Sequence, residues 1–414
     1  MAESRESTLG SPAWFVSAVR LLLAVIAVGM LAGGAGALFY CGLQVVQRWR
    51  EAQPWLMAGL PVVGVLTVLA YRWLGRDVAK GNRGLLDEIR RGEGRVSGWM
   101  APAITLSTWS THLCGGSAGA EGAALQLGGG IAAGACRMFR IRESARPLLL
   151  AAGMAAGMAA VFGLPWSAGL LVWEITRGRH SRQLLGIVLL AAWTAAGVCA
   201  SFGVQHVNYH ALGPAGVAGD LRLNGLQQLG MAGLLALLVG GMYQLYHELQ
   251  QQLQRRAQGL WGESLWQPFF GALLVLGIAF ACGQRDCLGL GVRSADPQAV
   301  TIVSCFQPGV AGSWTWGWKL CLTAVTLAAG FRGGEFTPLC FMGASLGNLV
   351  AQLSHAPTPF TVAMAMVTTI AAATRAPLAV SVMAIELFGW QHALIHACAI
   401  LAVQPLTRGK GLFS

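Results

Sequence analysis

Long apolar runs recur along the whole chain and limit its fold more than any other feature. A transmembrane helix needs about 20 mostly apolar residues, and both halves of the sequence hold runs of this kind. Hydrophobic residues make up 55% of the chain, charged residues only 11%, and the mean hydropathy is +0.57. A soluble domain of 414 residues cannot hide that much apolar side chain, so we predict an all-α, polytopic membrane protein. The runs include Trp14–Tyr40, Trp55–Trp73, Leu184–Val204, Leu229–Met242 and Phe269–Cys282.

The first run is longer than the core of a signal peptide and has no clear cleavage site, so we expect it to be retained. The segment before it, residues 1–13, is expected to be a disordered cytoplasmic tail.

Basic residues gather in short clusters between the apolar runs and give the chain a net charge of +11. The positive-inside rule predicts that these connections are cytoplasmic. Short clusters between spans do not favour nucleic-acid binding, the other interpretation of a basic chain. The clusters are Arg72, Arg76, Lys80, Arg83, Arg90, Arg91 and Arg95; Arg137, Arg140, Arg142 and Arg146; and Arg177, Arg179 and Arg182.

Cysteine and histidine spacing gives no clear metal or enzyme site. Cys282, Cys287 and Cys305 lie in or beside one long connection, and spacing alone leaves a disulfide among them open. His392 and His396 are four apart and would share a helix face, but without an acidic or cysteine partner nearby a packing role is favoured over a metal. We therefore expect no metal, no cofactor and no enzymatic activity.

The two halves of the chain repeat the same pattern. A Gly-Gly pair precedes Glu121, and another precedes Glu335. The stretch "GLPWSAGLLVWE" ends at Glu174, 53 residues after Glu121, and "RAPLAVSVMAIE" ends at Glu386, 51 residues after Glu335. The polar stretch Gln205–Asn224 separates the halves.

An internal repeat in a membrane protein indicates a transporter whose site lies where Gly- or Pro-interrupted helices meet. We predict two repeats with broken, re-entrant helices, the first over residues 14–213 and the second over residues 225–414. They are inverted-topology repeats if an odd number of spans separates the two copies.

Glu121 is a carboxylate without a cation near it in sequence, in the stretch "GGSAGAEGAAL". A carboxylate at membrane depth is costly and indicates a cavity or a function. The residues after it predict a short helix, whose N-terminus would attract an anion. The glutamate would serve as a built-in anion that occupies this site or takes up a proton and moves away. A plain helix cap is the alternative.

The second copy, "FRGGEFTPLCFMGASLG", predicts a helix whose first position is Pro338 and whose cap is Thr337. Glu335 is again an acid without a neutralising neighbour in sequence. Two protonatable glutamates near two helix N-termini can exchange an anion for protons. Glu174 and Glu386 are further proton-site candidates, although their place at helix ends favours polar packing.

The motifs of these segments resemble the CLC chloride channel and transporter family, and within it the fluoride/proton antiporter branch. "GGSAGAEGAALQLGG" is similar to the gating-glutamate segment, usually Gly-Arg-Glu-Gly. "GGEFTPLCFMGASLG" matches the Gly-Glu-x-Thr-Pro of the fluoride branch, where most members have Gly-Ile-Phe-Ala-Pro. "KGNRGLLDEI" resembles that branch's replacement for the Gly-Ser-Gly-Ile-Pro anion loop.

The resemblance implies a role for each matched position. Glu121 would be the external gating glutamate, and Glu335 the fluoride branch's own acid. Ile175 stands where chloride exchangers carry an internal proton glutamate, which the fluoride branch also lacks. The implied anion-binding residues are Asn82, Gly81, Gly122, Thr337, Phe336 and Phe413.

Two positions depart from the family pattern. Ala120 replaces the arginine before the gating glutamate, and Phe413 replaces the inner-gate tyrosine. The resemblance implies fluoride export coupled to proton import. The two departures favour the alternative, a passive, voltage-gated-type channel for chloride or fluoride. It also implies a homodimer with one pore per subunit in the lipid of the cell inner membrane. The expected partners are fluoride or chloride, protons and lipid.

Overall fold

The computed structural model describes residues 12–92, 95–176, 181–213, 223–262, 264–409 and 411–413. These residues form helices and connecting loops, and their one β-type contact is the isolated bridge between Gly119 and Gly334. Six of the described helical segments are long and apolar enough to cross a membrane. The prediction of an all-α, polytopic membrane protein is confirmed.

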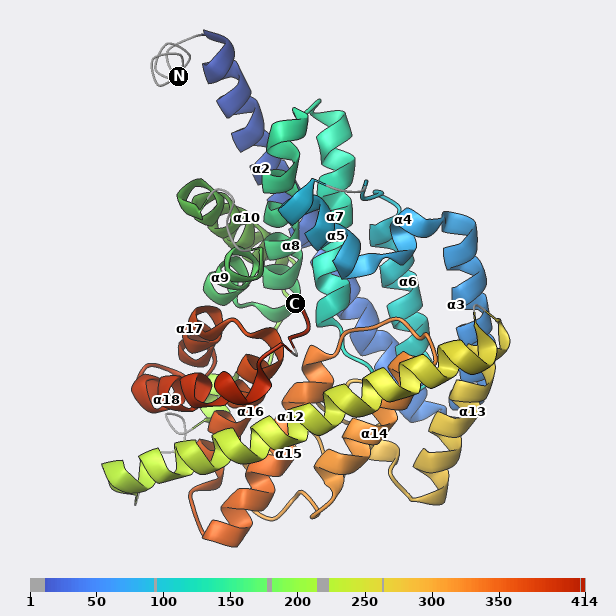
Figure 1. Ribbon diagram of the computed structural model, residues 1–414, viewed down its shortest axis with the longest axis vertical. Coiled ribbons are helices and arrows are strands. Elements are labelled where there is room, and N and C mark those ends of the chain that lie inside the picture. Colours follow the sequence, from blue (N-terminus) through green and yellow to red (C-terminus); the bar gives the residue numbers. More distant parts are fainter. Residues whose placement is uncertain are drawn as a thin grey trace.

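The helices of the first half occupy the upper part of Figure 1. The predicted run Trp14–Tyr40 belongs to one continuous helix, α2, which extends well beyond it. The main helices are α2 (Pro12–Ala52), α3 (Leu60–Leu74), α4 (Arg76–Ala79), α5 (Gly81–Arg91), α6 (Met100–Leu113), α7 (Glu121–Met138), α8 (Arg146–Phe162), α9 (Pro165–Ile175), α10 (Ser181–Ser201) and α11 (Tyr209–Leu212).

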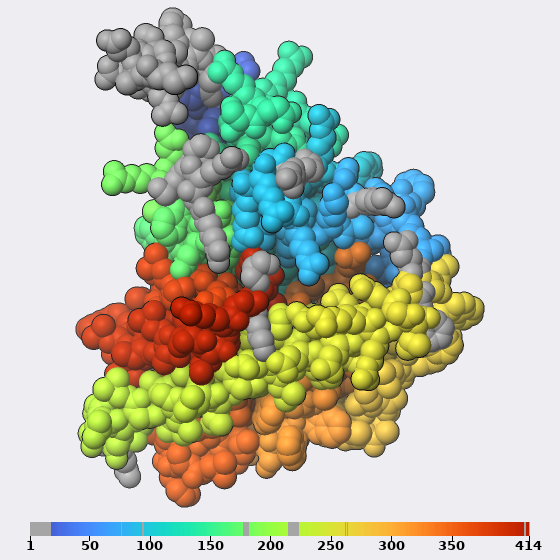
Figure 2. Space-filling model, in the orientation of Figure 1, coloured from blue at the N-terminus to red at the C-terminus, as the bar shows by residue number. Residues whose placement is uncertain are grey.

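The second half forms the lower part of Figure 1, where α12 crosses obliquely in front of the other helices. It packs against α14, α16 and α18. In Figure 2 this helix forms a continuous band across the visible face. The helices are α12 (Gly225–Trp261), α13 (Trp266–Ala281), α14 (Thr315–Ala328), α15 (Phe336–Ser354), α16 (Thr358–Thr374), α17 (Pro377–Phe388) and α18 (Ala393–Val403).

Short 3-10 helices complete the connections: η1 (Pro54–Gly59), η2 (Glu143–Ala145), η3 (Arg285–Cys287), η4 (Ser304–Phe306) and η5 (Pro405–Thr407). The predicted tail up to residue 11, residues 214–222 of the predicted divide between the halves, and Arg177 and Arg179 lie outside the described residues.

Glycines let the central helices of each half approach closely. A Cβ on Gly128 of α7 would lie 1.8 Å from the carbonyl oxygen of Gly153 on α8. On α15, a Cβ on Gly347 would lie 2.9 Å from the Cα of Val362 on α16. Small residues allow such contacts between helices in a membrane, where packing rather than hydrophobic burial drives association.

The cysteines and the paired histidines have the surroundings of packing residues rather than of a disulfide or a metal site. Each of the ten cysteines is a free thiol, so Cys282, Cys287 and Cys305 form no disulfide. His396 is fully buried, with ring centroids of Phe388 and Phe360 at 6.1 and 6.4 Å. No group of three metal-ligating side chains occurs among the described residues.

Candidate anion pathway

The loops that precede α7 and α15 are joined by their backbones. Gly119 and Gly334 exchange two N–H···O=C hydrogen bonds, each 2.6 Å long. Gly333, next to this bridge, has no room for a side chain, because a Cβ there would lie 2.5 Å from that of Ala118. The bridge brings together the N-termini of two helices that are more than 200 residues apart in sequence. Both helix dipoles therefore present their positive ends to one region.

Glu121 occupies this region. It is the first residue of α7, its exposed fraction is 3%, and the Thr337 hydroxyl of α15 donates a hydrogen bond to its Oε1. Backbone N–H groups of Glu121 and Thr337 also face the carboxylate. Its Oε2 has no hydrogen-bond partner and lies beside Gly119 and Gly334. The carboxylate thus takes the place that a bound anion would take at two converging helix N-termini.

The start of α15 differs from the prediction. The helix begins at Phe336, so Glu335 is its N-cap residue and Pro338 is the third helical position rather than the first. Pro338 is tolerated there because the first N–H groups of a helix have no partner within the helix. Thr337 does not cap the helix, since its hydroxyl donates across to Glu121.

The Glu335 side chain points toward α12 rather than toward the groups that contact Glu121. Its Oε1 accepts a hydrogen bond of 3.0 Å from the Gln250 amide. The hydroxyl of Tyr246, one turn earlier on α12, lies beside the same carboxylate without a hydrogen bond of normal geometry, and Glu335 Oε2 has no partner. Tyr246 is 1% exposed.

Sequence reasoning missed Tyr246 and Gln250. Gln250 lies in the polar run Gln250–Gln252, so the sequence gives no signal that singles out this pair.

Asn82 and Gly81 lie at the start of α5, next to α7. The Asn82 amide nitrogen would be 3.2 Å from a Cβ on Gly122, the residue that follows Glu121, and the Asn82 amide oxygen is buried without a partner. Gly81 has a φ of 57° and lies against the Gln126 amide. The structure therefore brings these three predicted positions to the N-terminal turn of α7.

Two side chains of α5, Glu88 and Arg90, hold this segment in place. Glu88 forms an ion pair with Arg146 of α8 and accepts a 2.6 Å hydrogen bond from the Val96 backbone. Arg90 donates to the carbonyl oxygens of Ile175, at 3.1 Å, and Phe413, at 2.7 Å. Phe413 is therefore tied to the C-terminal end of α9, and its half-buried ring packs against the core.

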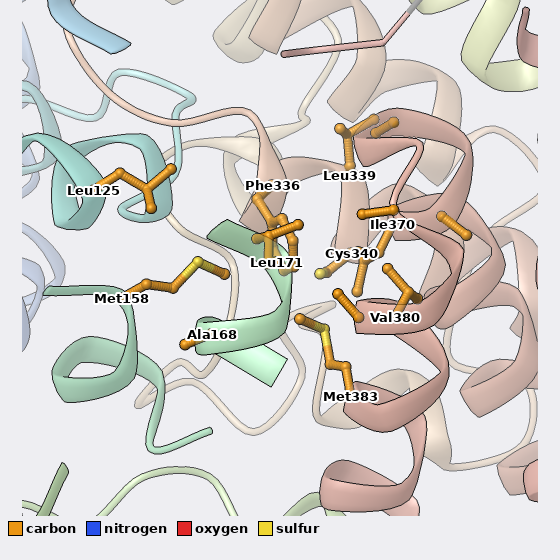
Figure 3. Close-up of a cluster of buried hydrophobic side chains, with 14 of the residues drawn as sticks. Leu125, Met158, Ala168, Leu171, Phe336, Leu339, Cys340, Ile370, Val380 and Met383 are labelled. Carbon is orange, nitrogen blue, oxygen red and sulfur yellow. The ribbon is translucent and has the colours of Figure 1, made fainter. Parts of the chain in front are cut away.

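Phe336 provides an apolar wall. Figure 3 shows its side chain beside Leu171 of α9, with Cys340 close by. Its ring centroid is 6.1 Å from that of Phe162, at the end of α8. The predicted anion-binding position thus has an aromatic ring between the two halves of the protein.

A cavity of about 760 Å³ reaches Glu121 from one side. Its walls include Glu121, Thr337 and Phe336 as well as the cationic side chains of Arg48 and Arg293. Glu335, Asn82 and Phe413 are not part of these walls. The cavity therefore reaches three of the predicted site residues, Glu121, Thr337 and Phe336.

Fold and site together define a class of polytopic membrane transport protein, in which broken helices from two halves meet around a buried carboxylate. The chain belongs to the voltage gated chloride channel family, whose model matches residues 63–404. This confirms the resemblance to the CLC family and the CLC-type fold.

Individual relatives cover nearly the whole chain. It is 35% identical over 394 residues to a "Chloride/fluoride channel protein" of Pseudomonas syringae pv. tomato, an alignment that spans 93% of this chain and 84% of that protein. A solved CLC-type fluoride/proton antiporter is 27% identical, with a TM-score of 0.86 over 95% of this chain and 96% of that one. A slow cyanobacterial Cl⁻/H⁺ antiporter, 20% identical with a TM-score of 0.77 over 94% and 95%, shares the fold.

Proposed function

We propose that this protein exports fluoride in exchange for protons through one glutamate-gated pore in each subunit. The observation that carries the proposal is the contact between Glu121 and Thr337, which joins the N-termini of α7 and α15. A carboxylate in this place competes with an anion for the same donors. Protonation weakens its attraction to the helix ends and lets the anion replace it.

The second glutamate supports coupling to protons. Glu335 is partly buried against α12 and accepts a hydrogen bond from Gln250, outside the cavity that reaches Glu121. Two carboxylates in separate surroundings can take up and release a proton on different sides of the anion site. The remaining residues of the pathway in this proposal are Asn82, Gly81, Gly122, Phe336 and Phe413. They belong to the two proposed repeats, residues 14–213 and 225–414.

Fluoride as the anion is supported by the Glu335-x-Thr337 motif and by the two relatives whose names include fluoride. A small, strongly hydrated anion needs hydroxyl and amide donors in place of its water. Thr337 and the amides at the start of α7 and α15 are such donors.

The test is transport by purified protein in liposomes. An outward fluoride gradient should drive protons into the liposomes in proportion to the fluoride that leaves. No movement of either ion would contradict the proposal.

A passive anion channel is the second candidate, and Phe413 favours it because a phenyl ring cannot donate a hydrogen bond to an ion at the inner gate. In the same liposomes a channel would release fluoride or chloride without moving protons. This outcome would replace antiport by passive conduction.

We further propose a homodimer in the cell inner membrane. α9, α10, α17 and α18 lie along one side of the molecule in Figure 1. The predicted contact surfaces, Gly163–Gly203 and Ala376–Val403, fall on these helices. Light scattering that found an active monomer in detergent would contradict the dimer.

A further inference from the structure

Lys319, on α14, is a lysine in the protein interior. Its exposed fraction is 0%, and within the described residues no carboxylate forms an ion pair with it. Its Nζ donates to the carbonyl oxygens of Gly289, at 2.8 Å, and Cys287, at 3.0 Å, and lies 5.1 Å from the ring centroid of Phe341. Carbonyl dipoles and a ring face solvate an ammonium but do not neutralise it. An unneutralised buried charge is costly, so its presence suggests a function.

The contacts of Lys319 lead to both segments that hold Glu121. The Cys287 carbonyl also accepts a 2.9 Å hydrogen bond from Ser117, four residues before Glu121. Phe341 lies four residues after Thr337 on α15. One helical turn, about 5.4 Å along the axis, separates Phe341 from Thr337, so Lys319 contacts α15 one turn from the residue that bonds Glu121.

The titratable groups that face Lys319 do not cancel its charge. They are Arg50 of α2, His112 of α6 and the Cys287 thiol, and none of them is a carboxylate. Arg50 lies against Gly289, since a Cβ there would be 1.9 Å from its Nη1. The region behind the Glu121 loop therefore carries positive charge from two elements.

A purely mechanical role for Lys319 would be to hold the loop around Gly289. A neutral amide can donate to the same two carbonyl groups with a smaller cost of burial, because desolvation is far greater for a charge. The ammonium charge is the property that this mechanical role leaves unexplained.

We propose that the protonated Lys319 side chain is a buried positive charge that attracts anions to the pathway. This inference rests on the proposed anion transport. At a separation on the order of 10 Å and an effective dielectric constant of about 20, an elementary charge changes a binding constant by about tenfold.

The test compares fluoride efflux from proteoliposomes at a series of internal fluoride concentrations. Lys319→Gln removes the charge and keeps amide donors for the two carbonyls, and should raise the KM for fluoride by about tenfold. Lys319→Met, which removes the donors as well, should raise the KM by a similar factor. Ser117→Ala is the matched control: it removes a hydrogen bond to the same Cys287 carbonyl without a change of charge, and its KM should stay near that of wild type.

The outcomes separate the two proposals. Wild-type protein that moves no fluoride would overturn the proposed function itself. Wild-type flux with an unchanged KM in Lys319→Gln would overturn only the role of Lys319. An equal rise of KM in Ser117→Ala would assign Lys319 to loop anchoring instead. If Lys319→Met does not yield folded protein, Lys319→Gln decides, since it retains the donors.

Discussion

Glu174 and Glu386 cap each other's helices: each lies near the C-terminal end of its own helix and caps the N-terminus of the other. Glu386 of α17 accepts hydrogen bonds from the backbone N–H groups of Trp166, at 3.0 Å, and Ser167, at 2.8 Å. Glu174 of α9 accepts from Leu378, at 3.3 Å, and Ala379, at 2.9 Å. The reciprocal caps join the two halves of the chain.

These contacts fit the polar-packing interpretation of both glutamates. A carboxylate that accepts two backbone N–H groups at a helix N-terminus satisfies donors that have no partner within the helix. It also faces the positive end of the helix dipole. No residue near in sequence takes this role, because α9 and α17 each begin with a proline after an uncharged residue.

Glu386→Ala should lower stability and leave proton coupling in place. The loss of a charged cap is expected to cost about 1–3 kcal/mol of unfolding free energy. Thermal unfolding in detergent measures the effect, and the exposed Glu143→Ala serves as control. Loss of proton-coupled flux at an unchanged unfolding temperature would instead identify Glu386 as a proton site.

Glu121→Gln should abolish pH-dependent anion exchange while the protein still folds. The amide keeps an oxygen for the Thr337 hydroxyl, but it carries no charge at the two helix N-termini and takes up no proton. Fluoride flux and proton flux are measured together in liposomes between pH 5 and 8. Glu51→Gln is the control, because Glu51 lines the same cavity. Proton-coupled flux at the wild-type rate in Glu121→Gln would contradict the assignment of Glu121 as the gate.

Glu335→Ala should stop the movement of protons by a fluoride gradient. The alanine leaves the Gln250 amide without its acceptor and removes the second protonatable group. Proton uptake under an outward fluoride gradient is the measurement, with fluoride efflux recorded in the same liposomes. Proton movement at the wild-type rate in Glu335→Ala would contradict the fluoride interpretation and leave only the membership of the CLC family.

Tyr246→Phe should slow proton-coupled fluoride flux, because it removes the polar group next to the Glu335 carboxylate. The substitution keeps the ring in its buried place and removes only the hydroxyl beside Glu335. Tyr243→Phe is the matched control, because its ring lies 6.4 Å from that of Tyr246 on the same helix. Equal losses in both variants would show that the hydroxyl beside Glu335 has no special role.

Phe413→Tyr should strengthen anion binding at the inner gate, or slow turnover by holding the ion too tightly. A new hydroxyl donor to a charged group contributes about 1.5–3 kcal/mol. Fluoride binding by calorimetry and flux in liposomes are the two measurements. Identical affinity and flux in both proteins would mean that the ring does not face the ion.

Local patterns in the sequence were sufficient to predict the class of protein and the place of Glu121 and Glu335 beside broken helices. Apolar runs predicted the helices, because a chain with 55% hydrophobic residues has to place them in lipid. Glycine pairs before Glu121 and Glu335 marked the loops that lead into α7 and α15. The start of α15 was predicted wrongly, because Pro338 fits the third helical position as well as the first.

The partners of these residues depend on tertiary structure alone. Thr337 and Glu121 are 216 residues apart, Ser167 and Glu386 are 219 apart, and Gln250 and Glu335 are 85 apart. No local periodicity relates such pairs, since each hydrogen bond forms only after helices from distant parts of the chain have packed. The sequence by itself therefore determined that carboxylates stand at broken helices in a membrane. Only the packed structure decided which hydroxyl, amide or helix end each carboxylate meets, because those contacts arise from long-range packing of helices.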